Sequence, residues 1–100
     1  MAAGILGSAD LAVATNTLLF TVDATPQTLN VRFANRNATA ARIRLAIGTG
    51  ASPALKDYVD YDVTVQGFGV LEDTGLVASL GEKVWAYSDT ANVSVRAHGI

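Results

Sequence analysis

The chain has 100 residues, of which 50% are hydrophobic and 16% charged, and its formal net charge is −2. This length fits one domain with enough apolar material for a core. The slight acidity gives no general reason to expect nucleic acid or an anionic membrane as a partner. Because cysteine is absent, disulfides, thiolate nucleophiles and cysteine-based zinc sites are excluded.

The first segment, MAAGILGSADLAVA, is apolar and rich in small residues. It lacks the basic start of a secretory signal, and Asp10 interrupts it. No run in the chain approaches the roughly 18 apolar residues of a membrane span, so we expect no membrane partner. We interpret residues 1–12 as a flexible N-terminal arm that docks on a partner through Ile5 and Leu6, and residues 13–100 as the folded domain.

From residue 17 onward, apolar and polar residues alternate in short runs that are separated by turn-forming residues. This period of two is typical of strands with one buried face. The residues expected to point inward include Leu29, Val31, Phe33, Ile43, Leu45, Ile47, Val59, Tyr61, Val63, Val65, Val93, Val95 and Ala97. The spacing predicts an all-β fold, a single antiparallel β-sandwich, jelly-roll-like, of seven or eight short strands.

The stretch QGFG, residues 66–69, separates two of these predicted strands. Phosphate-binding loops place their glycines between a strand and a helix, whereas here a strand follows. We therefore interpret QGFG as a hairpin turn. Phe68 is expected to tuck over the end of the sandwich, because aromatic side chains usually bury most of their area; the alternative is that it projects as a contact.

The candidates for catalysis or metal binding are few. His98 is the sole histidine, and the sequence marks neither a nucleophile nor an orienting carboxylate beside it. Asp60, Asp62, Glu72 and Asp73 could form an acidic cluster if a hairpin joins their strands, for acid–base chemistry or calcium. The chain lacks the framed cleft of a glycosidase, and Asp60 and Asp62 lie in a predicted strand rather than a calcium loop. We expect no catalytic residue, no metal and no cofactor, and the weaker alternative is a small enzyme that uses these acidic residues.

The candidate contact residues are aromatic and basic. Trp85 and Tyr87 alternate with Val84 and Ala86, so the aromatic pair either lies outside as a subunit contact or belongs to the core. Arginine favours interfaces because it is planar and multidentate. The outward arginines at 32, 42, 44 and 96 could converge on one sheet face, without the interleaved aromatics that single-stranded nucleic acid needs. The predicted interface residues are Ile5, Leu6, Arg42, Arg44, Phe68, Trp85 and Tyr87.

Several segments together resemble a family of small β-sandwich virion proteins of tailed bacteriophages. They are the strand ARIRLAI, the loop GTGASP, the segments DYVDYD and GVLEDTGLV, and the closing SDTANVSVRAHGI; the shared plan covers about residues 18–100. The resemblance brings no catalytic residue with it. It implies a structural virion protein, assembled in the bacterial cytoplasm and placed on the outer surface of the capsid or in the tail.

From this resemblance we expect a capsid decoration or cement protein that stabilises the shell through repeated contacts. Its partner would be the major capsid protein or a neighbouring virion protein, and a homo-oligomer, with a trimer favoured, would suit local three-fold positions. The alternative is a tail-associated or fibre-associated module that binds host-surface glycan through Tyr58, Phe68 or Trp85.

Overall fold

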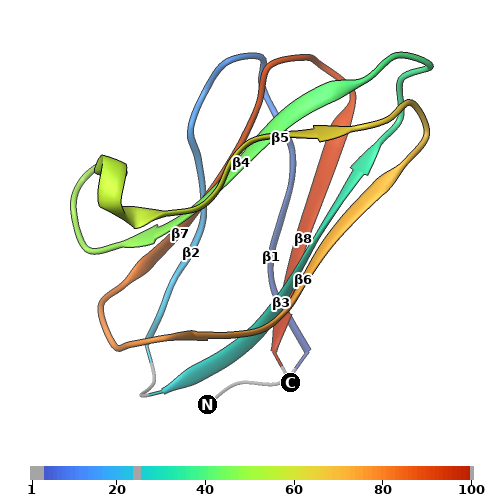
Figure 1. Ribbon diagram of the computed structural model, residues 1–100. Coiled ribbons are helices and arrows are strands. Elements are labelled where there is room, and N and C mark those ends of the chain that lie inside the picture. The colour runs from blue at the N-terminus through green and yellow to red at the C-terminus, as the bar shows by residue number, and fades with distance from the viewer. Residues whose placement is uncertain (1–3, 24–25, 100) are drawn as a thin grey trace.

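The computed structural model describes residues 4–23 and 26–99. Within these ranges the chain forms eight β-strands and one short 3-10 helix (Figure 1). In chain order they are β1 (Gly4–Asp10), β2 (Thr17–Thr21), β3 (Gln27–Asn35), β4 (Ala41–Gly48), η1 (Leu55–Asp57), β5 (Tyr58–Val65), β6 (Val70–Ala78), β7 (Lys83–Ser88) and β8 (Val93–Gly99).

The strands form two four-stranded antiparallel sheets that pack face to face. Sheet A has the order β1-β8-β3-β6 and sheet B has the order β2-β7-β4-β5. Every connection except the one between β4 and β5 crosses from one sheet to the other. This is the strand order of an eight-stranded jelly roll, and it confirms the predicted all-β sandwich.

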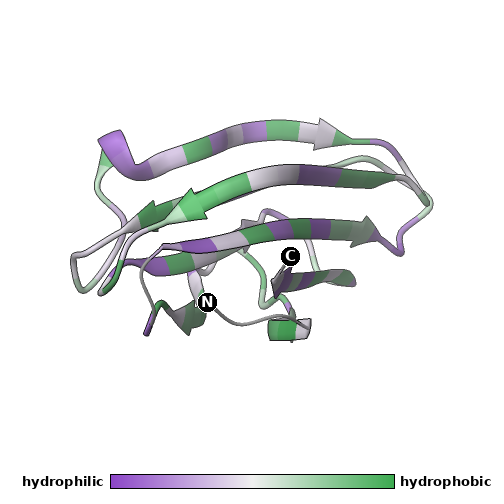
Figure 2. Cartoon of the chain, turned by 90° about the horizontal axis from the view of Figure 1, so that it is seen from below, coloured by the Kyte–Doolittle hydropathy of each residue, from purple (hydrophilic) through white to green (hydrophobic). Residues whose placement is uncertain are grey.

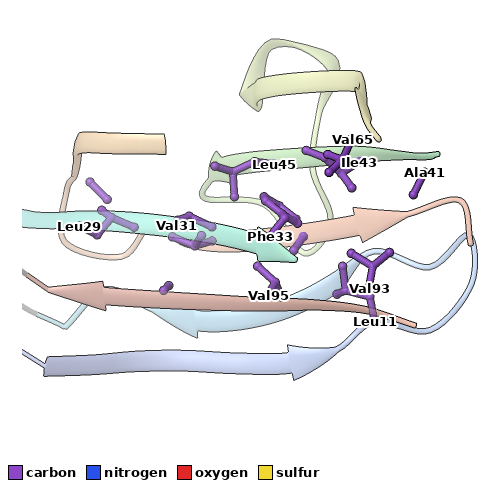
Figure 3. Close-up of a cluster of buried hydrophobic side chains, with 14 of the residues drawn as sticks. Leu11, Leu29, Val31, Phe33, Ala41, Ile43, Leu45, Val65, Val93 and Val95 are labelled. Carbon is purple, nitrogen blue, oxygen red and sulfur yellow. The ribbon is translucent and has the colours of Figure 1, made fainter. Parts of the chain in front are cut away.

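The core fills the space between the two sheets (Figure 3). On β3, Leu29, Val31 and Phe33 have no exposed surface, and polar residues alternate with them. The same alternation appears as bands of opposite hydropathy along the strands in Figure 2. Each fully buried side chain of this kind contributes roughly 1.5–3 kcal/mol to stability. The inward residues predicted on β4 and β8 are also buried, except that Ile47 is only partly so.

The predicted flexible arm over residues 1–12 is wrong for residues 4–11. Gly4–Asp10 form β1, which pairs with β8 as an edge strand of sheet A, and Leu11 is 3% exposed in the core. Gly7, one of the small residues of this segment, has a packing role, because a Cβ at this position would lie 2.5 Å from the backbone oxygen of Leu19. β1 therefore approaches β2 closely only with glycine at this position. Residues 1–3 lie outside the described part of the chain.

β5 departs from the predicted alternation. Its pairing with β4 shifts from Ile43 opposite Val63 to Leu45 opposite Asp60, so β5 contains one extra residue there. Such a β-bulge reverses the orientation of the residues that precede it. The residue at the bulge, Asp62, has a φ of 54°. Tyr61, predicted inward, is consequently 52% exposed.

Candidate protein interface

The outer face of sheet B carries four of the predicted contact residues: Arg42, Arg44, Trp85 and Tyr87. β7 buries Val84 and Ala86 against the core, so Trp85 and Tyr87 point to the opposite side. The neighbouring strand β4 places Arg44 directly opposite Tyr87. Trp85 therefore lies half-buried on the outer face of the sheet and not in the core between the sheets, and its role as a subunit contact stays a prediction.

The four outward arginines do not converge on one sheet face. Arg42 and Arg44 belong to β4 in sheet B, whereas Arg32 on β3 and Arg96 on β8 belong to sheet A. The outer faces of the two sheets point in opposite directions, so the expectation of a single basic face is wrong. Alternation predicts which residues point outward, but it does not predict which sheet a strand joins.

Arg44 is the centre of a compact cluster on this face. Its Cζ atom lies 4.2 Å from the centroid of the Tyr61 ring and 4.4 Å from that of Tyr87. Its Nε donates to Oδ1 of Asp62 at 2.6 Å, and its Nη2 donates to Oδ2 at 3.3 Å. Two cation–π contacts and a bidentate ion pair fix the guanidinium in place.

The Arg44–Asp62 pair also changes the acidity of both partners. The hydrogen bond from Arg44 lowers the pKa of Asp62, and the hydrogen bond to Asp62 raises the pKa of Arg44. Both groups therefore stay charged across the physiological pH range. We define the contact face as Arg44, Tyr58, Tyr61, Asp62, Trp85 and Tyr87.

Tyr58 and Tyr61 extend the contact face along β5. Their rings meet edge to face, with centroids 4.9 Å apart and an interplanar angle of 83°. Tyr61 reaches Arg44 because of the bulge at Asp62, and the sequence pattern gives no sign of that bulge. The alternation of residues 58–65 fits a regular strand, so sequence reasoning placed Tyr61 in the core.

Trp85 adds an apolar margin on the side of β2. It pairs with Leu18, which is 44% exposed. The Nε1 atom of Trp85 is buried and has no hydrogen-bond partner within the described residues. Buried indole N–H groups usually find an acceptor, so this unpaired N–H is a cost to the folded chain.

Phe68 lies in the loop between β5 and β6 and is not part of the contact face. It is 75% exposed with a φ of 56°, so the expectation that it covers the end of the sandwich is wrong. Its amide donates to the carbonyl of Asn37 at 2.9 Å. A Cβ on Gly67 would lie 2.1 Å from the Ala38 oxygen, so the two loops are in close contact. Left-handed φ is unfavourable for an aromatic residue, and the loop packing holds Phe68 in it.

The remaining predicted contact residues lie elsewhere. Ile5 and Leu6 belong to β1 in sheet A, on the other side of the molecule from Arg44. Leu6 packs against the core, whereas Ile5 is 56% exposed. The structure thus brings together the sheet B residues of the predicted interface and separates them from Ile5, Leu6 and Phe68.

The acidic residues divide among three environments rather than forming one cluster. Asp62 pairs with Arg44, and Glu72 lies 3.9 Å from Arg32 on sheet A. Only Asp60 and Asp73 meet, between the edge strands β5 and β6. Burial, and then the hydrogen bond and charge of Asp73, raise the pKa of Asp60 to about 7.

Among residues 4–23 and 26–99, no three histidine, cysteine, aspartate or glutamate side chains lie close enough to hold a metal ion. His98 pairs across the sheet with Ile5 and Asn30, and its Nδ1 atom has no hydrogen-bond partner in that part of the chain. A triad histidine needs an orienting carboxylate at this nitrogen or its counterpart.

Comparison with protein-family models, curated proteins and solved structures finds no match to this chain. The molecule itself defines a jelly-roll sandwich with a preformed Arg–Tyr cluster on one outer face. In the described ranges, no helix is long and apolar enough to cross a membrane.

Proposed function

We propose that this chain is a structural virion protein of a tailed bacteriophage, specifically a capsid decoration or cement protein. The observation that carries the proposal is the cluster of Arg44 between Tyr61 and Tyr87, anchored by Asp62 on an exposed sheet face. The resemblance to phage virion proteins supplies the context, and jelly rolls recur in viral capsid domains. Because one fold serves many functions, the contact face carries more weight than the fold.

The contact face suits a protein partner. Arginine, tyrosine and tryptophan are the residues most enriched at binding hot spots. Arg44 is already fixed by its ring contacts and ion pair, so little side-chain freedom is lost when a partner docks. The partner would be the major capsid protein or a neighbouring copy, and repetition over the shell would multiply a modest affinity per contact.

The same cluster argues against a sugar-binding tail module. Carbohydrate platforms need an open aromatic face, and Arg44 covers one face of Tyr61 and of Tyr87. Trp85 is half-buried against its neighbours. Phe68 alone among the predicted sugar-binding aromatics is strongly exposed, at 75%. We therefore favour a protein contact on sheet B over a glycan contact.

Immunogold electron microscopy of the parent particle tests the placement. Label spread over the heads would support a decoration protein. Label confined to the tail would contradict that role and favour a tail-associated module. Unlabelled particles would contradict a virion role altogether.

Incorporation of variants into particles tests the contact face itself. Arg44→Ala and Tyr87→Ala should fold but lose most particle binding, because truncating a hot-spot residue weakens binding by about tenfold or more. Lys56→Ala, which removes an exposed charge on η1, is the matched control and should bind normally. Normal incorporation of both contact-face variants would refute the assignment of this face.

A further inference from the structure

The outer face of sheet A, opposite to the contact face, contains a shallow hollow of about 640 Å³. It lies across β1, β8 and β3. The residues that line it are Ser8, Ala9, Asp10, Arg32, Ala34, Arg36, Ser94, Val95 and Arg96. We call it the arginine hollow. Its strands come from both ends of the chain, so residues distant in the sequence meet in it.

The register of the strands explains the shape of the arginine hollow. One row across the sheet reads Ser8, Arg96, Arg32, because Arg96 pairs with both Ser8 and Arg32. The next row places Ser94 opposite Ala34. The hollow therefore lies where the small side chains of Ser94 and Ala34 adjoin the row that holds the two arginines.

The charges around the hollow are only partly compensated. Arg36 forms an ion pair with Asp10, and Arg32 has Glu72 at 3.9 Å. Arg96 has no ion pair within the described residues. It also stands directly opposite another cation, Arg32. Like charges directly opposite each other destabilise a strand pair. An anionic group held between the two guanidinium groups would remove this repulsion.

We propose that the arginine hollow binds a carboxylate side chain on an extended segment of a partner protein. Arg96 and Arg32 would donate to the carboxylate in the planar, two-pronged geometry that arginine favours. The hydroxyl groups of Ser8 and Ser94 lie beside them as further donors. This binding surface is separate from the contact face on sheet B and does not depend on its role.

Charge complementarity favours a carboxylate over a polyphosphate chain. The hollow and its rim hold three arginines, Arg32, Arg36 and Arg96, against Asp10 and Glu72, so their net charge is 3 − 2 = +1. The whole chain carries a net charge of −2. Nucleic acid binding relies on neutralising several phosphates at once, which one excess positive charge does not achieve, whereas one carboxylate matches it.

The test titrates the full chain with a short peptide, acetyl-Gly-Glu-Ser-Glu-Gly-amide, and follows amide signals by NMR. We expect saturable shifts at Ser8, Ser94 and Arg96, and none with the peptide in which glutamine replaces glutamate. Arg96→Gln should weaken binding by about tenfold, as loss of a charge-assisted hydrogen bond predicts. Lys56→Gln, which removes the same charge from an exposed position on η1, should leave the affinity unchanged.

A second variant introduces a carboxylate of the chain's own into the arginine hollow. Ala34→Glu places a carboxylate in the hollow near Arg32 on β3 and Arg36, which follows the end of β3, and it should abolish peptide binding while the fold is kept. Any of three results would overturn the proposal: no saturation up to about 10 mM peptide, equal losses in Arg96→Gln and Lys56→Gln, or tighter binding of inorganic phosphate or an oligonucleotide than of the acidic peptide.

Discussion

The pair of carboxyl groups of Asp60 and Asp73 should make this protein less stable as the pH rises toward 7, which is the opposite of the usual effect of an aspartate. Asp60 and Asp73 each bury an Oδ2 atom to which no described group donates, so a hydrogen bond between the two carboxyl groups requires a proton on one of them. Burial of Asp60, and then its contact with Asp73, raise its pKa to about 7, whereas an aspartate in an unfolded chain titrates near 3.9. Between these values the folded chain holds a proton that the unfolded chain has lost.

The sign of the effect follows from this difference in bound protons. Where the folded state binds more protons, the free energy of unfolding falls as the pH rises. The stabilisation linked to protonation of Asp60 is therefore complete below about pH 4, declines as the pH rises, and is lost above about pH 7. The full pKa difference would correspond to about 4 kcal/mol. Since Asp60 is only partly buried, screening by solvent reduces the expected effect to about 1–2 kcal/mol.

The substitution Asp60→Asn removes the titrating group and keeps its shape. We expect the variant and the wild type to be similarly stable near pH 4, and the variant to be more stable by about 1–2 kcal/mol near pH 8. Urea unfolding at a series of pH values measures the free energy of unfolding of both proteins. The titration of the other carboxylates cancels in the difference between the variant and the wild type. Asp23→Asn, at an exposed position, is the matched control.

Two outcomes would refute this reasoning. A difference in unfolding free energy that stays constant with pH would show that Asp60 does not titrate between the two states, and a difference that grows toward low pH would reverse the sign. Asp73→Asn separates the two causes of the shift. It should reduce the pH dependence without abolishing it, because burial of Asp60 is the larger cause.

Three further substitutions test other features of the fold. Arg44→Ala should lower the free energy of unfolding by about 1–2 kcal/mol, because it removes two cation–π contacts; an unchanged urea midpoint would contradict the stacked geometry. Phe68→Gly should leave stability unchanged or raise it by up to about 1 kcal/mol, because relief of the left-handed strain offsets the greater freedom of unfolded glycine; a clear loss in thermal unfolding would show that the ring is packed. Gly7→Ala should destabilise by about 1–3 kcal/mol through its contact with Leu19, and wild-type stability would mean that β1 does not pack closely on β2.

The fold class was predictable because it depends on alternation within single strands. Leu29, Val31 and Phe33 read as one buried face in the sequence, and they are buried. Which strands pair, and in which register, cannot be inferred from the alternation within one strand. Gly7 looks like part of a flexible segment until Leu19 is placed beside it, and the bulge at Asp62 exists only in relation to β4.

The candidate contact face was predictable to the same extent. Trp85 and Tyr87 share a face by alternation, and so do Arg42 and Arg44, but only the sheet order shows that β4 and β7 are neighbours. Tyr61 was missed because the bulge turned it outward. The arginine hollow was missed because Arg32 and Arg96 come from distant parts of the sequence and meet only through the pairing of β3 with β8.

The two proposed binding surfaces lie on opposite faces of one sandwich, and this placement bears on how the proposed virion protein would act. Arg44 lies on sheet B and Arg96 on sheet A, with the buried core between them. A protein that used one face alone could coat a shell without linking its subunits. A protein that used both could bridge two partners, and the second contact would then form at a high effective concentration. Loss of Arg96 should therefore weaken the reinforcement of a shell more than it weakens attachment, whereas loss of Arg44 should weaken both.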